Sequence, residues 1–158
     1  MKKPYYKVEG YQSRRSVGYL LRRGSKLITT AVENMFSAED DVNFVQWVIL
    51  MHLRDGLGST AAELCDRLCH DSGALTRILD QMEKRGLVQR TRSQQDRRVV
   101  ELHLTDKGRQ ITESHLPPLV ELYNSLFEDF TKEETDQIID LLIRLNAKLA
   151  AHNGVKGD

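Results

Sequence analysis

Four arginines are predicted to gather at one bend of the chain, and gathered guanidinium groups are well suited to bind phosphate. The run LVQRTR contains Arg90 and Arg92, while Arg97 and Arg98 stand just before the run VVELHL. Both runs are short and contain strand-forming residues, which predicts a hairpin with arginine at its tip. Because like charges repel, we expect such a tip to be stabilised by a polyanion that binds to it.

Charge is unevenly distributed along the whole chain, although the net charge is zero. Residues 1–26 hold eight Lys or Arg against one acid, and residues 84–98 hold six against one acid. Residues 112–140 are the reverse, with eight acids against one Lys. Basic segments of this kind favour a polyanionic partner, and the alternative is charge that only solvates helix surfaces.

Other chemistry-bearing residues follow no pattern typical of an enzyme. The sequence has no glycine-rich phosphate loop, no Gly-x-Ser-x-Gly and no convincing pair of carboxylates. His-x-x-x-His spacing is absent too, and Cys65, Cys69 and His70 have no clear fourth ligand for zinc. We therefore expect no enzymatic activity, no cofactor and no bound metal.

The two cysteines are four residues apart in the sequence. On a helix their β-carbons would lie ~5–6 Å apart, whereas a disulfide needs ~3.5–4.5 Å. A bridge between Cys65 and Cys69 would therefore distort the helix, and two half-buried apolar side chains are the favoured interpretation. A thiol-based redox sensor that uses both cysteines is the alternative.

Size and composition favour a single, mostly helical domain. The chain has 158 residues, of which 40% are hydrophobic, and only three prolines. No apolar run approaches the ~18 residues of a membrane span, and the basic N-terminus lacks the apolar stretch of a signal peptide. We expect a cytoplasmic protein that does not associate with membranes.

The elements that position the arginines follow from hydrophobic spacing and chain breakers. Pro117 and Pro118 predict a break near residues 113–116, because proline cannot occupy a helix interior without loss of a hydrogen bond. We expect helices at residues 13–36, 42–54, 61–69 and 72–85, strands at 87–92 and 99–104, and helices from Thr105 to the break, after the break, and from Thr131 to about residue 151. This order predicts an α+β fold that is mostly α with a small β-hairpin, a winged helix-turn-helix.

The helix predicted at residues 72–85 has one apolar face and one polar face. Leu75, Leu79 and Met82 fall on the apolar face, which we expect to meet the core. In a helix-turn-helix the N-terminal residues of the second helix reach base edges in the major groove. The residues so placed are Ser72, Gly73, Ala74, Thr76 and Arg77. An amphipathic helix whose outer face is merely solvated is the alternative.

The predicted hairpin follows this helix directly, so both elements are expected on one side of the molecule. Arginine at a wing tip suits the narrow minor groove of DNA, where negative potential is strongest. Asp96 is expected to pair with a neighbouring arginine and hold the tip in shape. The predicted DNA-binding residues of the wing are Arg90, Arg92, Arg97 and Arg98.

Two motifs at the predicted wing belong together. GLVQR at residues 86–90 leads into the first strand, and a second motif combines Asp-x-Arg with a strand and Leu-Thr-x-x-Gly, matched by Asp96, Arg98, Leu104, Thr105 and Gly108. With these motifs, residues 44–112 resemble the MarR family of bacterial transcriptional regulators. Toward both ends of the chain only the helix layout is similar.

The resemblance implies a sequence-specific regulator, commonly a repressor, that binds a pseudopalindromic operator as a homodimer. In the family the terminal helices interlock, so residues 1–40 and 109–158 would form a dimerisation region and residues 41–108 the winged DNA-binding part. Apolar stripes on the terminal helices agree, because separated helices are most easily covered by a second subunit. A winged-helix module that binds protein instead of DNA is the alternative, and the retained arginines argue against it.

Members of the family usually respond to a small molecule, often a phenolic or aromatic acid, that binds between the two regions and lowers DNA affinity. Arginine with aromatic walls suits a planar carboxylate. The candidates on the first two predicted helices are Arg14, Arg15, Tyr19, Trp47 and His52. For each of these five residues, the alternative to effector binding is a side chain that packs in the core or is only solvated. Some members sense peroxides through a cysteine in the first helix, and that helix has no cysteine here.

Overall fold

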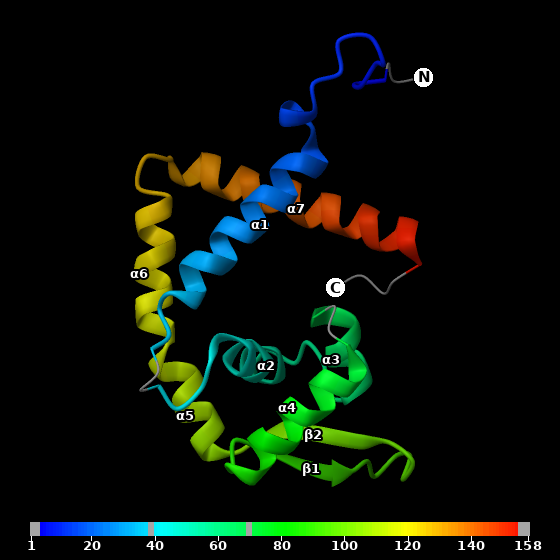
Figure 1. Ribbon diagram of the computed structural model, residues 1–158, viewed down its shortest axis with the longest axis vertical. Helices are drawn as coiled ribbons and strands as arrows, with labels where there is room; N and C mark the ends of the chain where they lie inside the picture. The colour runs from blue at the N-terminus through cyan, green and yellow to red at the C-terminus, as the bar shows by residue number, and fades with distance from the viewer. Residues whose placement is uncertain (1–3, 38–39, 69–70, 155–158) are drawn as a thin grey trace.

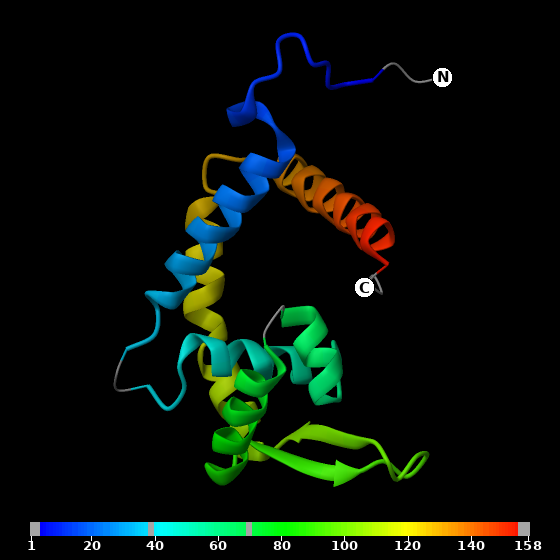
Figure 2. The same ribbon diagram turned by 45° about the vertical axis from the view of Figure 1, so that its right-hand side comes forward.

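The structure is a computed structural model that describes residues 4–37, 40–68 and 71–154. Its elements are η1 (Ser13–Arg15), α1 (Val17–Glu33), α2 (Phe44–Arg54), α3 (Ala61–Leu68), α4 (Ser72–Lys84), β1 (Val88–Arg92), β2 (Val100–Leu104), α5 (Asp106–Ser114), α6 (Leu116–Leu126) and α7 (Lys132–Asn153). Two parts are visible: a winged unit made of α2 to α5 with the hairpin, and a helical arm made of α1, α6 and α7 (Figure 1, Figure 2). The predicted fold class is confirmed.

Helix α2 lies at the centre of the winged unit because its residues are apolar nearly all round. Ile49 and Leu50 are completely buried, and they share one core cluster with Leu64 of α3 and with Leu79 and Met82 of α4. Burial of this many large aliphatic side chains is the main force that holds the helices together.

Local capping sets the ends of α3 and α4. The carboxylate of Asp71 accepts hydrogen bonds from the backbone N–H groups of Gly73 and Ala74, both at 3.0 Å, and so begins α4. Past the other end, Gly86 has a φ of 67°, a conformation that glycine adopts without strain. A capping box begins α3, because Thr60 and Glu63 exchange backbone-to-side-chain hydrogen bonds of 3.1 and 3.2 Å.

The reversal at Gly86 leads directly into an antiparallel hairpin. Strand β1 pairs with β2 so that Val88 lies opposite Leu104 and Arg92 lies opposite Val100. The buried side chains of Val88 and Leu102 anchor the hairpin on the core. Its far end carries the predicted arginine-rich bend away from the core.

Two predicted helices are divided or end differently in the structure. The expected helix at residues 13–36 is split, because the hydroxyl of Ser16 accepts a hydrogen bond from the backbone N–H of Tyr19 and caps α1. At the predicted proline break, α5 ends at Ser114 and α6 begins at Leu116. Both prolines lie in the first turn of α6, where a missing N–H costs nothing. The break is therefore confirmed.

The helical arm leaves large apolar side chains in solvent, and α7 buries none of its residues in the chain. The exposed apolar residues of the arm are Val17, Leu20, Leu27, Ile28, Val120, Tyr123, Leu126, Phe130, Ile139, Leu141, Leu142, Ile143 and Leu149. A surface patch of this size on a single chain usually marks an interface. Among the helices in the described part of the chain, none is both long enough and apolar enough to cross a membrane.

Candidate nucleic-acid interface

Helix α4 and the hairpin lie at the end of the molecule that is farthest from α7 (Figure 1, Figure 2). At the start of α4, Ser72, Gly73, Thr76 and Arg77 are exposed, as a base-reading surface requires. Ala74 is half-buried, and whether it contacts DNA stays a prediction. The side chain of Asp71 also occupies two backbone amides of the first turn, which reduces the capacity of this helix end to bind phosphate.

The hydroxyl of Thr76 is used within the helix. Its Oγ1 donates a hydrogen bond of 2.8 Å to the backbone carbonyl oxygen of Ser72. A hydroxyl that donates in this way keeps an acceptor lone pair and its neighbouring methyl group for a base edge. Thr76 can therefore offer a base edge its methyl group or an acceptor lone pair, but not its hydroxyl hydrogen.

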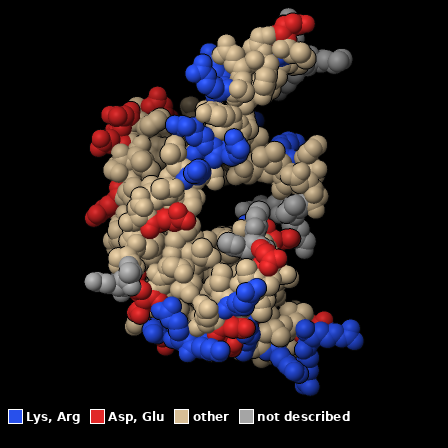
Figure 3. Space-filling model, in the orientation of Figure 1, with Lys and Arg blue, Asp and Glu red and all other residues tan. Residues whose placement is uncertain are grey.

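The wing tip is held together by its backbone. Asp96 accepts a hydrogen bond of 2.9 Å from the backbone N–H of Arg98 through its side chain, and one of 2.9 Å from the N–H of Val99 through its carbonyl. The expected ion pair between Asp96 and a neighbouring arginine is not among the contacts of the described residues, because the turn places the Arg98 amide on that carboxylate. Arg92, Arg97 and Arg98 are exposed, and blue side chains gather at this end of the molecule (Figure 3).

Arg90 is paired with acids of its own chain, and whether it also contacts DNA stays a prediction. Its Nη1 lies 2.7 Å from Oδ1 of Asp80 and 2.7 Å from Oε2 of Glu83, both on α4. Although burial acts to lower it, the pKa of Arg90 is raised overall by these two carboxylates. Because the chain reverses at Gly86, β1 runs back beside the last turns of α4 and brings Arg90 to them. Arg90 thus ties the wing to α4 and neutralises acids near the interface.

The structure also explains Thr105 and Gly108 of the wing signature. Thr105 donates a hydrogen bond of 2.6 Å to the carbonyl of Gly86, and its hydroxyl accepts one of 3.1 Å from the N–H of Gly108. A β-carbon placed on Gly108 would lie 2.1 Å from the carbonyl oxygen of Leu87. Glycine is therefore required where α5 crosses the start of β1.

The predicted effector-binding residues do not gather at one place. Trp47 is core, since it is 3% exposed and its Nε1 donates to the carbonyl of Thr112 at 3.3 Å. Arg14 and Arg15 lie in η1 at the far end of α1, and Tyr19 is half-buried in the first turns of α1. Within one chain these residues do not form one site, because α1 points its start away from α2 (Figure 1), and their role in effector binding stays a prediction.

His52 alone among those candidates lines a large cleft. The cleft has a volume of about 1050 Å³ and lies between the winged unit and α7. Its walls include Arg109 of α5, His103 of β2 and Asn146 of α7. Figure 3 shows the hollow between the two parts of the molecule.

Cys65 is half-buried on α3 and packs against the core cluster, as the apolar interpretation predicts. Cys69 and His70 lie outside the described residues. Within the described part of the chain there is no group of three histidine, cysteine or acidic residues that could hold a metal ion. Whether the two cysteines act together stays a prediction.

The helix-turn-helix with its adjoining wing defines a class of DNA-binding proteins, and comparison with known proteins gives the family. Residues 40–99 match the MarR family. The HTH-type transcriptional regulator SarZ of Staphylococcus epidermidis is 32% identical over 104 residues, which cover 65% of this chain and 68% of SarZ. The chain belongs to the MarR family and is a DNA-binding transcriptional regulator.

Solved structures agree with this family. The Multiple Antibiotic Resistance Repressor, MarR, is 27% identical with a TM-score of 0.70, over 82% of this chain and 94% of that one. A mutant MarR from E. coli complexed with operator DNA is 26% identical with a TM-score of 0.66, over 85% of this chain and 99% of that one.

Proposed function

We propose that this protein is a homodimeric repressor that binds a pseudopalindromic operator and releases it when a small organic effector binds. The observation that carries the proposal is the pairing of an exposed arginine wing and α4 at one end with an unburied apolar arm at the other. One end suits DNA, and the other suits a second copy of the chain. In support of repression, a related protein of the same fold is named a repressor.

The dimer follows from the cost of exposed apolar area. Leu20 and Leu27 of α1 and Leu141 and Ile143 of α7 are all more than half exposed. Each Å² of such area that a partner covers contributes about 25 cal/mol. A second copy has the same exposed apolar helices, so in a two-fold dimer the apolar arm of one chain can pack against the apolar arm of the other.

An effector in the cleft would touch both parts of the molecule at once. His52 and Arg109 belong to the winged unit, whereas Asn146 belongs to the arm. A ligand that fits only one relative position of the two parts shifts their equilibrium toward that position. Arg109, which lines the cleft together with His52, supplies a cation for a ligand with an acidic group, in line with an aromatic acid.

We expect the protein to sediment at twice its chain mass, and to bind a selected operator duplex as one dimer per duplex. Sedimentation velocity at micromolar concentration measures both quantities, and titration with aromatic carboxylic acids should release the duplex in the same experiment. A monomer that binds the duplex with undiminished affinity would contradict the proposal.

Arg98→Ala should weaken operator binding about tenfold or more, because a wing arginine in the minor groove makes favourable contacts in a strongly negative field. The salt dependence should also become shallower by about one counterion. The free energy of unfolding should change by less than about 0.5 kcal/mol, since the side chain is exposed. Fluorescence anisotropy over a salt series measures the first two effects, and urea unfolding measures the third.

Arg90→Ala is the matched control from the same hairpin. It leaves Asp80 and Glu83 without their shared cation, so it should lower the free energy of unfolding by about 1 kcal/mol. If Arg98→Ala destabilises the protein as much as Arg90→Ala and leaves DNA affinity unchanged, Arg98 has no direct role at the DNA.

A further inference from the structure

The chain passes between the helical arm and the winged unit at two places, and these two places meet. One is the connection from α1 to α2, residues 34–43, and the other is His115 between α5 and α6. The ring of Phe36 stacks on the ring of His115, with centroids 4.8 Å apart and planes 10° apart. The contact between Phe36 and His115 therefore lies where a change in angle between arm and winged unit would act.

His115 contacts two acceptors through its two ring nitrogens. Nδ1 lies 3.0 Å from the carbonyl oxygen of Ile111, and Nε2 lies 3.7 Å from Oδ1 of Asp40. The His115 ring is thus held from two sides, by Ile111 of α5 and by Asp40 of the connection between α1 and α2.

Asp40 is held as a charged carboxylate. The backbone N–H of Ser37, 2.5 Å from Oδ2, lowers the pKa of Asp40, and His115 lowers it further. Around His115 the other groups are the rings of Phe36 and Trp47 and the hydroxyl of Ser114, none of which is charged. Among the described residues, Asp40 is the charged side chain that faces the imidazole.

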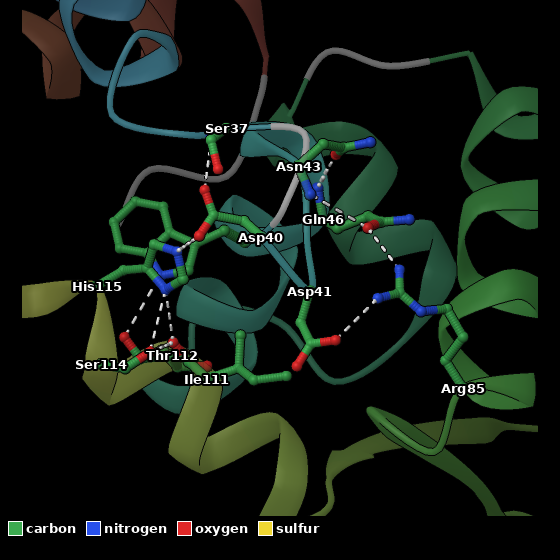
Figure 4. Close-up of polar contacts among 11 residues, drawn as sticks. Ser37, Asp40, Asp41, Asn43, Gln46, Arg85, Ile111, Thr112, Ser114 and His115 are labelled. Carbon is green, nitrogen blue, oxygen red and sulfur yellow. Dashed lines mark hydrogen bonds and ion pairs between the residues drawn. The ribbon is translucent and has the colours of Figure 1, made fainter.

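The same connection also reaches the end of α4. Asp41 lies 3.9 Å from Nη2 of Arg85, the residue that caps α4. Arg85 in turn donates a hydrogen bond of 3.2 Å to Oε1 of Gln46, which belongs to the capping box of α2. One short segment thus links the arm, His115 and the helix that reads DNA (Figure 4).

We propose that Asp40 and His115 are positioning residues for DNA binding: the contact of His115 with Asp40 and the stack of its ring on Phe36 hold the winged unit at the angle that the operator requires. The inference rests on the proposed homodimer, because this angle then sets the distance between two copies of α4.

The test compares the operator affinity of the full-length protein with that of its variants at one pH. Asp40→Asn and His115→Gln should each lower this affinity about fivefold. The double variant should lose no more than either single variant, because both remove one interaction. Asp136→Asn is the matched control, since the carboxylate of Asp136 also contacts a side chain, with Nζ of Lys132 at 2.6 Å, but lies in α7 away from the joint.

A second measurement separates positioning from a purely structural role. The parent should reject an operator with one base pair added between its half-sites more strongly than either variant does. Urea unfolding checks that the variants fold. If His115→Gln does not fold, Asp40→Asn is sufficient for the test, since the asparagine oxygen can still accept the hydrogen bond from the backbone N–H of Ser37.

Each outcome has a distinct meaning. Parent and variants with the same operator affinity and the same spacing preference would overturn the positioning role while the dimer stands. A parent that fails to bind any operator as a dimer would instead refute the proposed function.

Discussion

Gly108→Ala is expected to lower the free energy of unfolding by roughly 3 kcal/mol, at the upper end of the cost of overpacking a core. The added β-carbon would sit 2.1 Å from the carbonyl oxygen of Leu87, and backbone cannot yield as a flexible side chain does. That carbonyl also accepts hydrogen bonds from the backbone N–H of Thr105 at 3.2 Å and from its hydroxyl at 3.1 Å. Moving it therefore disrupts the junction between wing and α5 as well.

Gly58→Ala provides the control within the same winged unit. Its added β-carbon would meet side-chain atoms of Glu63 and Leu64 at 3.4 Å, an ordinary contact distance. Urea unfolding of both variants at one protein concentration, monitored by Trp47 fluorescence, measures the difference. Equal midpoints for the two variants would show that α5 does not approach β1 as closely as the structure has it.

Insertion of five base pairs between the half-sites of a selected operator should weaken binding by at least about a hundredfold. The proposed dimer presents two copies of α4, and both must enter major grooves on one face of the duplex. Grooves on one face recur every ~10 bp, or ~34 Å, so five added base pairs turn one half-site to the far side. The dimer then keeps the contacts of a single half-site.

The control replaces five spacer base pairs without changing the spacer length. Binding should then stay near that of the parent operator, apart from small effects of DNA flexibility. Footprinting and anisotropy with both duplexes provide the comparison. Equal affinity for the inserted and the parent operator would mean that the two half-sites are read independently, which a rigid two-fold dimer does not allow.

Most of the fold could be predicted because its signals are local. Asp71 and Gly86 bound α4, and the two prolines divide α5 from α6, through bonds that reach no farther than one helical turn. The spacing of apolar residues predicted which face of α4 meets the core, and the exposed positions of Ser72, Thr76 and Arg77 follow from the same periodicity.

The sequence by itself thus determined the order of elements, their caps and an arginine-bearing wing beside a solvent-facing helix. Only the tertiary structure decided which charges pair and which aromatics are core. Arg90 meets Asp80 and Glu83, and Trp47 is buried against Thr112 65 residues away. His115 likewise contacts Asp40, although the two residues belong to separate connections between the arm and the winged unit. The reason is physical: periodicity and capping act within a few residues, whereas these contacts depend on how whole helices pack, which no local pattern specifies.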